Sequence, residues 1–168
     1  MKVREEFLLM KNLLYGKGMF RNYFLTKGFG IADTYLLSFD RALRRAKIEN
    51  YNLVKISSIL PPGVKRKNKI SLPYSSILHI AYASLISNKK GEVISAVCGI
   101  AIPQNPEQIG MIMEWSDFER REKGIAEVKK MLESAMYDRG IKIKKIEIVS
   151  VEKNVKDFTC VFAGCAVF

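Results

Sequence analysis

Residues 52–62 read NLVKISSILPP, an apolar and β-branched run that ends in two serines and two prolines. This composition predicts a strand over Asn52–Leu60, followed by a turn at the prolines. The Ser57-Ser58 pair has two interpretations. It is an ordinary polar strand end, or it is a bond that the chain cuts itself, because a serine hydroxyl that faces the preceding carbonyl can attack it and leave a ketone at the new amino terminus. The dipeptide alone favours the strand end.

Similar strand-like runs recur along most of the chain. Several of them are apolar at both odd and even positions, which is typical of strands buried on both faces. A short turn at residues 103–106 separates two of these runs and indicates a hairpin. The further strands are predicted at His79–Ser87, Glu92–Ile102, Gln108–Trp115, Lys145–Val151 and Cys160–Phe168.

Two helices are predicted by apolar residues at helical spacing. The longer one contains Ile125–Met136, with a capping box at Ser116–Glu119 before it and Gly140 as its stop. The shorter one covers Ser38–Ala46. A third amphipathic segment is a candidate in the first 20 or so residues. Strands outnumber helices, and the helices are long enough to cover sheets, so we expect an α+β single domain whose sheets carry helices on their outer faces.

The net charge of +11 raises the question of a polyanionic partner. The one dense basic block, Lys65–Lys69, has no interleaved aromatic residues that could stack on bases. We interpret it as a solvated loop and expect no nucleic-acid partner. The sequence shows no membrane span and no secretory signal of ordinary length, which predicts a cytoplasmic protein.

Metal and hydrolytic chemistry find little support in the sequence. The three cysteines, Cys98, Cys160 and Cys165, show no metal-ligand spacing, and the last two are expected on opposite faces of one strand. His79 is the only histidine, and no serine lies in a nucleophile elbow. The chain is also short for an enzyme that binds pyridoxal phosphate. We therefore expect neither a metal nor pyridoxal phosphate.

Three polar residues are candidates for a functional site. Glu114 lies among apolar residues near the end of a predicted strand, where a carboxyl has a raised pKa and can act as a general acid. Asp40 falls in the first turn of its predicted helix, which favours an anion that could bind a guanidinium. Asn52 shares strand parity with Ser58, but an extended chain would separate the two by roughly 20 Å. The alternatives are a solvent-facing carboxylate for Glu114 and simple helix capping for Asp40.

Taken together, these stretches resemble the pyruvoyl-dependent arginine decarboxylases. Residues 52–62 resemble the processing site of that family, and SFDRAL at 38–43 resembles its Phe-Asp-x-Ala-Leu helix. The similarity extends from about Gly28 to the end of the chain, and the amino-terminal segment matches only loosely. Further matching stretches follow in order at Ala81-Tyr82, Gly91–Ala96, Ala101–Pro103, Gly110–Glu114 and Cys160–Ala163.

The resemblance implies a four-layer αββα sandwich and a self-processing enzyme that converts L-arginine to agmatine and carbon dioxide in polyamine biosynthesis. Ser58 would attack the carbonyl of Ser57, which would yield a β chain of residues 1–57 and an α chain of residues 58–168. A pyruvoyl group would then stand in place of Ser58 as the covalent cofactor.

The resemblance also implies roles for the three candidate residues. Asn52 would assist the cleavage, Glu114 would return a proton to the substrate, and Asp40 would bind the substrate guanidinium. The cleaved protomers of the family form homotrimers with active sites between protomers, which would remove the difficulty of the Asn52 distance.

Departures from the family pattern leave alternatives open. Lys47 and Glu49 stand where the family has small residues, in a loop at the guanidinium end of the substrate. Residues 74–77, YSSI, replace a glycine-containing segment, and the basic block at 65–69 is unlike the family. The same chemistry on another amino acid is therefore an alternative. A second alternative is an unprocessed paralogue that serves as a structural or binding subunit.

Overall fold

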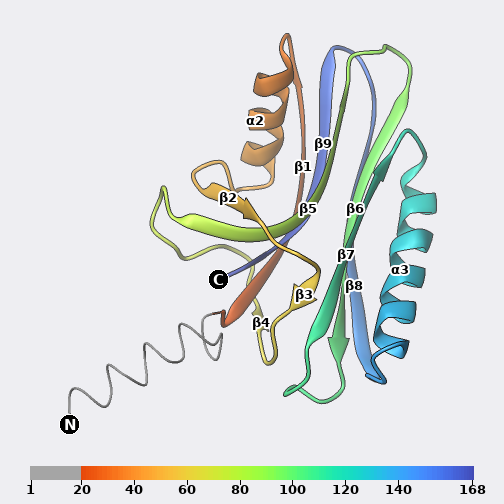
Figure 1. Ribbon diagram of the computed structural model, residues 1–168. Coiled ribbons are helices and arrows are strands. Elements are labelled where there is room, and N and C mark those ends of the chain that lie inside the picture. The colour runs from red at the N-terminus through yellow and green to blue at the C-terminus, as the bar shows by residue number, and fades with distance from the viewer. Residues whose placement is uncertain (1–19) are drawn as a thin grey trace.

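The computed structural model describes residues 20–168, which form two packed β-sheets (Figure 1). The predicted amino-terminal amphipathic segment lies almost wholly outside the described residues. One sheet has five strands in the order β2-β5-β9-β1-β4, and the other has four in the order β3-β7-β6-β8. The strands are β1 (Asn22–Ala32), β2 (Asn52–Lys55), β3 (Ile59–Leu60), β4 (Lys65–Arg66), β5 (Ile77–Ser87), β6 (Val93–Pro103), β7 (Gly110–Asp117), β8 (Ile143–Asn154) and β9 (Phe158–Val167).

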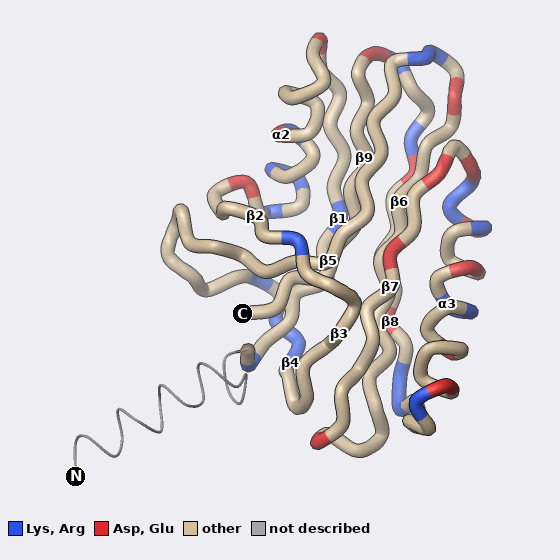
Figure 2. Tube along the Cα trace, viewed as in Figure 1, with Lys and Arg blue, Asp and Glu red and all other residues tan. Residues whose placement is uncertain are grey.

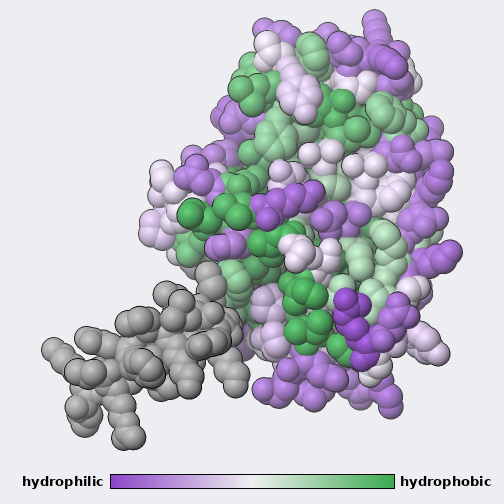
Figure 3. Space-filling model, in the orientation of Figure 1, coloured by the Kyte–Doolittle hydropathy of each residue, from purple (hydrophilic) through white to green (hydrophobic). Residues whose placement is uncertain are grey.

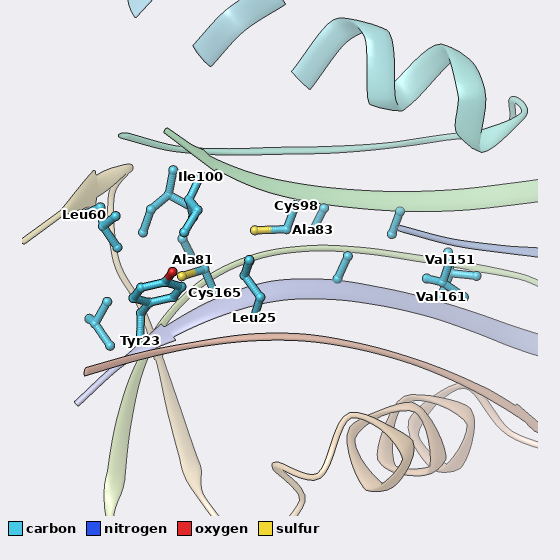
Figure 4. Close-up of a cluster of buried hydrophobic side chains, with 14 of the residues drawn as sticks. Tyr23, Leu25, Leu60, Ala81, Ala83, Cys98, Ile100, Val151, Val161 and Cys165 are labelled. Atoms are coloured by element: carbon cyan, nitrogen blue, oxygen red, sulfur yellow. The ribbon is translucent and has the colours of Figure 1, made fainter. Parts of the chain in front are cut away.

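Two helices complete a four-layer αββα sandwich, as predicted. Helix α2 (Tyr35–Arg45) covers the outer face of the five-stranded sheet, and α3 (Arg121–Tyr137) covers the outer face of the four-stranded sheet (Figure 1). Three apolar clusters fill the three interfaces between the layers. The cluster between the sheets includes Leu25, Cys98, Ile100 and Cys165 (Figure 4). Sheets that are covered on both faces explain why several strands are apolar at both parities.

The charged residues follow the same layers. Strands β5, β6 and β9 carry no lysine, arginine, aspartate or glutamate, and these residues concentrate on the helices, on other strands and in connecting loops (Figure 2). Within residues 20–168, no helix combines the length and the apolar character that crossing a membrane requires. The basic block was predicted to be a loop, but two of its residues form β4, which pairs with β1, and Arg66 makes a 2.9 Å ion pair with Glu147.

Strand β1 has no counterpart among the predicted strands, and two glycines explain why. A Cβ atom on Gly30 would overlap the carbonyl oxygen of Ser38, and one on Gly28 would overlap that of Ala42. Both carbonyls belong to α2, so the helix backbone lies directly on this strand. The close approach requires residues without side chains, and these interrupt the apolar alternation by which a strand is recognised.

Both helices begin at positions that differ from the predicted ones. Helix α2 starts at Tyr35, because the side chain of Thr34 accepts a hydrogen bond from the N–H of Leu37 and caps it. The predicted capping box at Ser116–Glu119 is wrong, since Ser116 is still in β7 and α3 starts at Arg121. The carboxylate of Glu152 in β8 accepts a 2.9 Å hydrogen bond from the N–H of Arg121 and replaces the missing local cap.

The predicted strand Asn52–Leu60 is divided between the two sheets. Residues 52–55 form β2, which runs parallel to β5 at the edge of the five-stranded sheet. Residues 59–60 form β3, which pairs with β7 at the edge of the four-stranded sheet. The chain therefore crosses from one sheet to the other at residues 56–58, and Ser57 and Ser58 lie in this crossing.

Candidate functional site

The crossing between the sheets is held by main-chain hydrogen bonds on both sides. The N–H of Ile56 donates to the carbonyl of Ile80 at 3.2 Å, which continues the pairing of β2 with β5. The N–H of Ile112 in β7 donates to the carbonyl of Ser58 at 2.7 Å, which extends the pairing of β3. The crossing is thus a short bend whose two ends are each anchored to a sheet.

Ser58 is the central residue of a three-residue turn. The N–H of Ile59 donates to the carbonyl oxygen of Ser57 at 2.8 Å, a hydrogen bond between residues i+2 and i that defines a γ-turn. The only non-glycine residues with positive φ in residues 20–168 are Lys47 and Ser75, so the turn at Ser58 is of the inverse type. The side chain of Ser57 is exposed and that of Ser58 is partly buried.

Glu114 lies on β7 beside this bend, two residues beyond Ile112. It shares a strand face with Ile112, which is buried in the apolar cluster between the sheets, and it stands opposite Cys98 of β6. The Oε2 atom of Glu114 is buried and has no hydrogen-bond partner among residues 20–168. A buried carboxyl oxygen without a partner is unusual, which makes Glu114 a candidate site residue.

The environment of Glu114 raises the pKa of its carboxyl. Burial is the main cause, and the positive charge of Lys55 acts in the opposite direction. The raised pKa confirms the prediction from the apolar neighbours of Glu114. A carboxyl in this state keeps its proton to higher pH than an exposed one, which is the property that a proton donor needs.

Lys55 is a further residue beside the bend that the sequence did not single out, although it lies within the stretch 52–62. It is the last residue of β2, and its ammonium group lies 4.9 Å from the ring centroid of Tyr82 in β5. Its positive charge lowers the pKa of Glu114 and so partly offsets the effect of burial on that carboxyl. A lysine in an apolar strand was the only sequence signal for this position.

Asn52 lies at the other end of β2 from the serine pair. Its Nδ2 atom donates a 2.8 Å hydrogen bond to the carbonyl of Ser75, and its N–H donates to the carbonyl of Ser76. Ser75 has a positive φ of 67°, so Asn52 stabilises a turn that is unfavourable for a serine. The amide group of Asn52 is therefore engaged with the 73–76 turn of its own protomer.

Asp40 lies on α2, and its predicted position in the helix is wrong. Because α2 begins at Tyr35, the first turn contains no acidic residue and Asp40 is in the second turn. Its side chain is exposed, next to Leu36, Leu37 and Leu43 in a shallow pocket on the outer layer. The five-stranded sheet separates this pocket from Glu114, so one protomer does not bring Asp40 and Glu114 together.

The two residues that depart from the family pattern lie at the end of α2. Lys47 has a positive φ of 60° and follows the carboxyl-terminal cap residue Ala46. The N–H of Ile48 donates to the carbonyl of Leu43, and the N–H of Lys47 to that of Arg44, which is the Schellman pattern. Glycine is the usual residue at this position of a helix end, because it adopts a positive φ readily. The backbone conformation is therefore the first reason for a small residue where this chain has Lys47.

Glu49 lies near the same helix end and lines a surface pocket with Arg41, Arg44 and Arg45. The pocket that contains Asp40 is formed by a different set of residues. Neither Lys47 nor Glu49 therefore shares the pocket of Asp40 within one protomer.

The cysteines and the charged groups of residues 20–168 contain no cluster that could hold a metal ion. Cys98, Cys160 and Cys165 are buried free thiols. Cys160 lies in the cluster under α2 and Cys165 in the cluster between the sheets, which confirms that they occupy opposite faces of β9.

The αββα sandwich, with a serine pair at the crossing between its sheets and a buried carboxyl beside it, is compatible with an enzyme that makes its own cofactor. Comparison with known proteins identifies the family. Residues 22–168 match the family model of the pyruvoyl-dependent arginine decarboxylases. The chain belongs to this family.

Curated relatives agree over most of the chain. A pyruvoyl-dependent arginine decarboxylase of Methanocaldococcus jannaschii is 35% identical over 86% of this chain and 87% of its own length. One of Pyrococcus furiosus is 38% identical over 74% of this chain and 79% of its own length. A solved pyruvoyl-dependent histidine decarboxylase has a TM-score of 0.46 and 12% identity, over 60% of this chain and 54% of that one, a likeness too slight to bear on function.

The residues at the crossing fit the pyruvoyl group that the family name implies. The carbonyl of Ser58, the residue from which the resemblance derives this group, is fixed by the N–H of Ile112. The partnerless Oε2 atom of Glu114, two residues further along β7, is an acceptor that a small polar group or a substrate could satisfy.

Proposed function

We propose that the chain cleaves itself between Ser57 and Ser58 and that the product decarboxylates L-arginine to agmatine and carbon dioxide. The observation that carries the proposal is the position of the Ser57-Ser58 bond in a hydrogen-bonded bend beside the buried carboxyl of Glu114. The cleavage would give a β chain of residues 1–57 and an α chain of residues 58–168. The proposal places the reaction in the cytoplasm, at the head of polyamine synthesis.

The covalent pyruvoyl group derived from Ser58 would supply an electron sink for the charge that develops when the substrate loses its carboxylate. Ile112 would hold the carbonyl next to this group through the hydrogen bond that it already makes to Ser58. Glu114 would donate a proton to the substrate carbon, since its raised pKa favours the protonated form. No metal and no pyridoxal phosphate enter the proposed reaction.

Asn52 would assist the cleavage by fixing the start of β2. Its side chain ties β2 to the 73–76 turn, and β2 leads directly into the bend. Loss of this tether would loosen the serine pair relative to β7, which is a strand of the other sheet.

We also propose that the cleaved protomers assemble as a homotrimer in which Asp40 reaches the site of a neighbouring protomer. Within one protomer the five-stranded sheet lies between Asp40 and Glu114. The edge that contains β2 and β3 carries exposed apolar side chains, namely Val54 at 43%, Ile59 at 38% and Ile77 at 58% exposure, and Figure 3 shows hydrophobic side chains gathered there. An apolar edge of this kind is suited to contact with a second copy. Asp40 would then bind the substrate guanidinium in a two-point fork.

An intact-mass measurement of the purified protein tests the cleavage, and carbon dioxide release from a panel of amino acids tests the substrate. We expect two fragments that end at Ser57 and begin at residue 58, and release from L-arginine in preference to the other amino acids. An uncut chain in an active preparation would contradict the self-processing. Release from a different amino acid would retain the chemistry and reject arginine as the substrate.

A further inference from the structure

The two carbonyl groups at the serine pair both accept hydrogen bonds from the main chain. The Ser58 carbonyl is bound by Ile112 of the neighbouring strand, and the Ser57 carbonyl is bound by Ile59 of its own turn at 2.8 Å. The first bond is part of the pairing between β3 and β7. The second contributes nothing to either sheet, so its role lies in the bend itself.

The alternation of β3 explains why the N–H of Ile59 is available. In an antiparallel ladder, the residues of one strand direct their N–H groups alternately toward and away from the partner. Ser58 is hydrogen-bonded to Ile112, so the next N–H, that of Ile59, is directed away from β7. β3 is an edge strand, and no further strand lies on this side. The N–H therefore turns back to the carbonyl of Ser57.

We propose that the main-chain N–H of Ile59 is the oxyanion donor of the self-cleavage. The inference rests on the cleavage proposed above. When the hydroxyl oxygen of Ser58 attacks the carbonyl carbon of Ser57, a C–O bond forms and the carbonyl π electrons move onto the oxygen that Ile59 already contacts. Preorganised donors at 2.7–3.1 Å from a developing oxyanion stabilise the transition state at no reorganisation cost.

The remaining steps balance with water as the only co-reactant. The hydroxyl proton passes to the nitrogen of Ser58 as the C–N bond breaks, which leaves an ester between Ser57 and the Ser58 oxygen. Loss of the Ser58 α-proton then breaks the bond between Cβ and the ester oxygen, and Ser57 leaves as a carboxylate. Water hydrolyses the resulting enamine through its imine form, releasing ammonia and leaving the ketone. Ile59 acts only in the first of these steps, where charge develops on the Ser57 oxygen.

Among the hydrogen bonds of residues 20–168, none runs from a side chain to the carbonyl oxygen of Ser57. The amide of Asn52, which is the residue expected to assist the cleavage, donates to Ser75 at 2.8 Å. The ammonium of Lys55 lies over the ring of Tyr82. The main chain is therefore the donor that the geometry assigns to the Ser57 oxygen.

The test replaces Ile59 of the full-length chain with its α-hydroxy acid, which removes the N–H and retains the side chain. Cleavage is followed by fragment mass over time, so that a cut at the 57–58 bond is distinguished from hydrolysis of the new ester at 58–59. We expect cleavage to be slower by about 10²- to 10³-fold, the usual effect of removing one oxyanion donor. Far-ultraviolet circular dichroism checks that both proteins are folded.

The matched control makes the same replacement at Lys67, whose N–H donates to the carbonyl of Tyr23 beside β4, away from the bend, rather than to the scissile carbonyl. We expect this variant to cleave at nearly the rate of the unmodified chain. Cleavage of the Ile59 variant at the unmodified rate would overturn the inference and leave the proposed function intact. Equal slowing of both variants would also overturn it, because the loss would then be a general effect of a missing main-chain hydrogen bond. An unmodified chain that never cleaves would reject the proposed function itself.

Discussion

The carbonyl oxygen of Ser58 accepts a 2.7 Å hydrogen bond from the main-chain N–H of Ile112. This bond joins the crossing between the sheets to β7, two residues before Glu114. It fixes the backbone of the serine pair. Among residues 20–168, neither serine hydroxyl makes a hydrogen bond that would give it a structural role. The two serines should differ in function, because the hydroxyl of Ser58 is the one that would attack the preceding carbonyl, that of Ser57.

Ser58→Ala is expected to abolish cleavage, since it removes the attacking oxygen. Ser57→Ala is the matched control, because Ser57 contributes its carbonyl and its exposed side chain is not needed. The denatured mass of each purified variant decides the matter. A Ser58→Ala chain that is still cut at the 57–58 bond, or a Ser57→Ala chain that stays whole, would show that the attack is assigned to the wrong residue.

Glu114→Gln is expected to cleave normally and to release carbon dioxide at least about 10²-fold more slowly, the usual contribution of a general acid. The amide retains the shape of the carboxyl and cannot donate a proton with the same ease. Fragment masses and carbon dioxide release are measured on the same preparation. Full activity in the cleaved variant would exclude Glu114 as the proton donor.

The same substitution should change how stability depends on pH. A carboxyl with a raised pKa binds its proton more tightly in the folded state, so the folded state loses stability as pH rises from the ordinary carboxyl pKa of 4.5 through the raised value. Below that window Glu114 is protonated in both states and contributes no such loss. Urea unfolding of Ser58→Ala with and without Glu114→Gln should show a gain for glutamine that appears as pH rises toward neutrality. A pH-independent difference would contradict the burial of this carboxyl.

Lys55→Met is expected to raise the pKa of Glu114 further, because it removes the positive charge that opposes the effect of burial. The falling limb of the pH–activity profile, where Glu114 loses its proton, should move to higher pH. Lys55→Arg keeps the charge and serves as the control, with a profile close to that of the unmodified enzyme. Identical profiles for all three proteins would mean that Lys55 does not act on the proton donor.

Asp40→Asn and Ser58→Ala are each expected to be inactive on arginine, the first through loss of the guanidinium partner and the second through loss of the cofactor. Mixed assemblies formed by joint refolding of the two variants should recover activity, because some sites then combine Asp40 from one chain with the cleaved Ser58 position of another. Carbon dioxide release from the mixture, compared with each variant alone, is the measurement. Absence of recovery in demonstrably mixed trimers would place both residues in the site of one chain.

Lys47→Gly is expected to stabilise the uncleaved Ser58→Ala chain by about 0.5–1 kcal/mol. Glycine adopts the positive φ of this helix end without the side-chain penalty, and its greater freedom in the unfolded chain offsets only part of that gain. Lys47→Ala is the control and should not stabilise, since alanine keeps the penalty. Urea midpoints give the comparison. In the chain that retains Ser58, Lys47→Gly should leave activity on the amino acid panel the same, and a change of preferred substrate would instead make Lys47 a determinant of specificity.

Periodicity and composition were sufficient for the layers of the fold and insufficient for the crossing. The apolar runs that became β5, β6 and β9 are recognisable because strands with both faces covered are apolar throughout. The stretch 52–60 has the same local character, yet it divides after Lys55, because pairing with β5 and then with β7 decides where each half lies. Such long-range pairing leaves no local signal.

The site shows the same division between local and long-range causes. Burial raises the pKa of Glu114, and the apolar stretch around this residue in the sequence made that burial predictable. The donors Ile59 and Ile112 act through their main chains, so their side chains give no indication of the role. The helix of Asp40 begins earlier than its sequence pattern suggests, because Thr34 provides a cap that the apolar spacing alone does not reveal.

The crossing at residues 56–58 also determines what the proposed cut would do to the folding of the molecule. The segment before it contributes β1, which pairs with β9 from Tyr23 to Ala32 and lies inside its sheet, between β9 and β4. After the cut, this strand would belong to a separate polypeptide that remains enclosed by the other one. Unfolding would then release two molecules from each protomer, and refolding would require them to meet again. Folding of the precursor is unimolecular, whereas folding of the mature protein would join two chains. The unfolding midpoint of the mature protein would therefore depend on protein concentration.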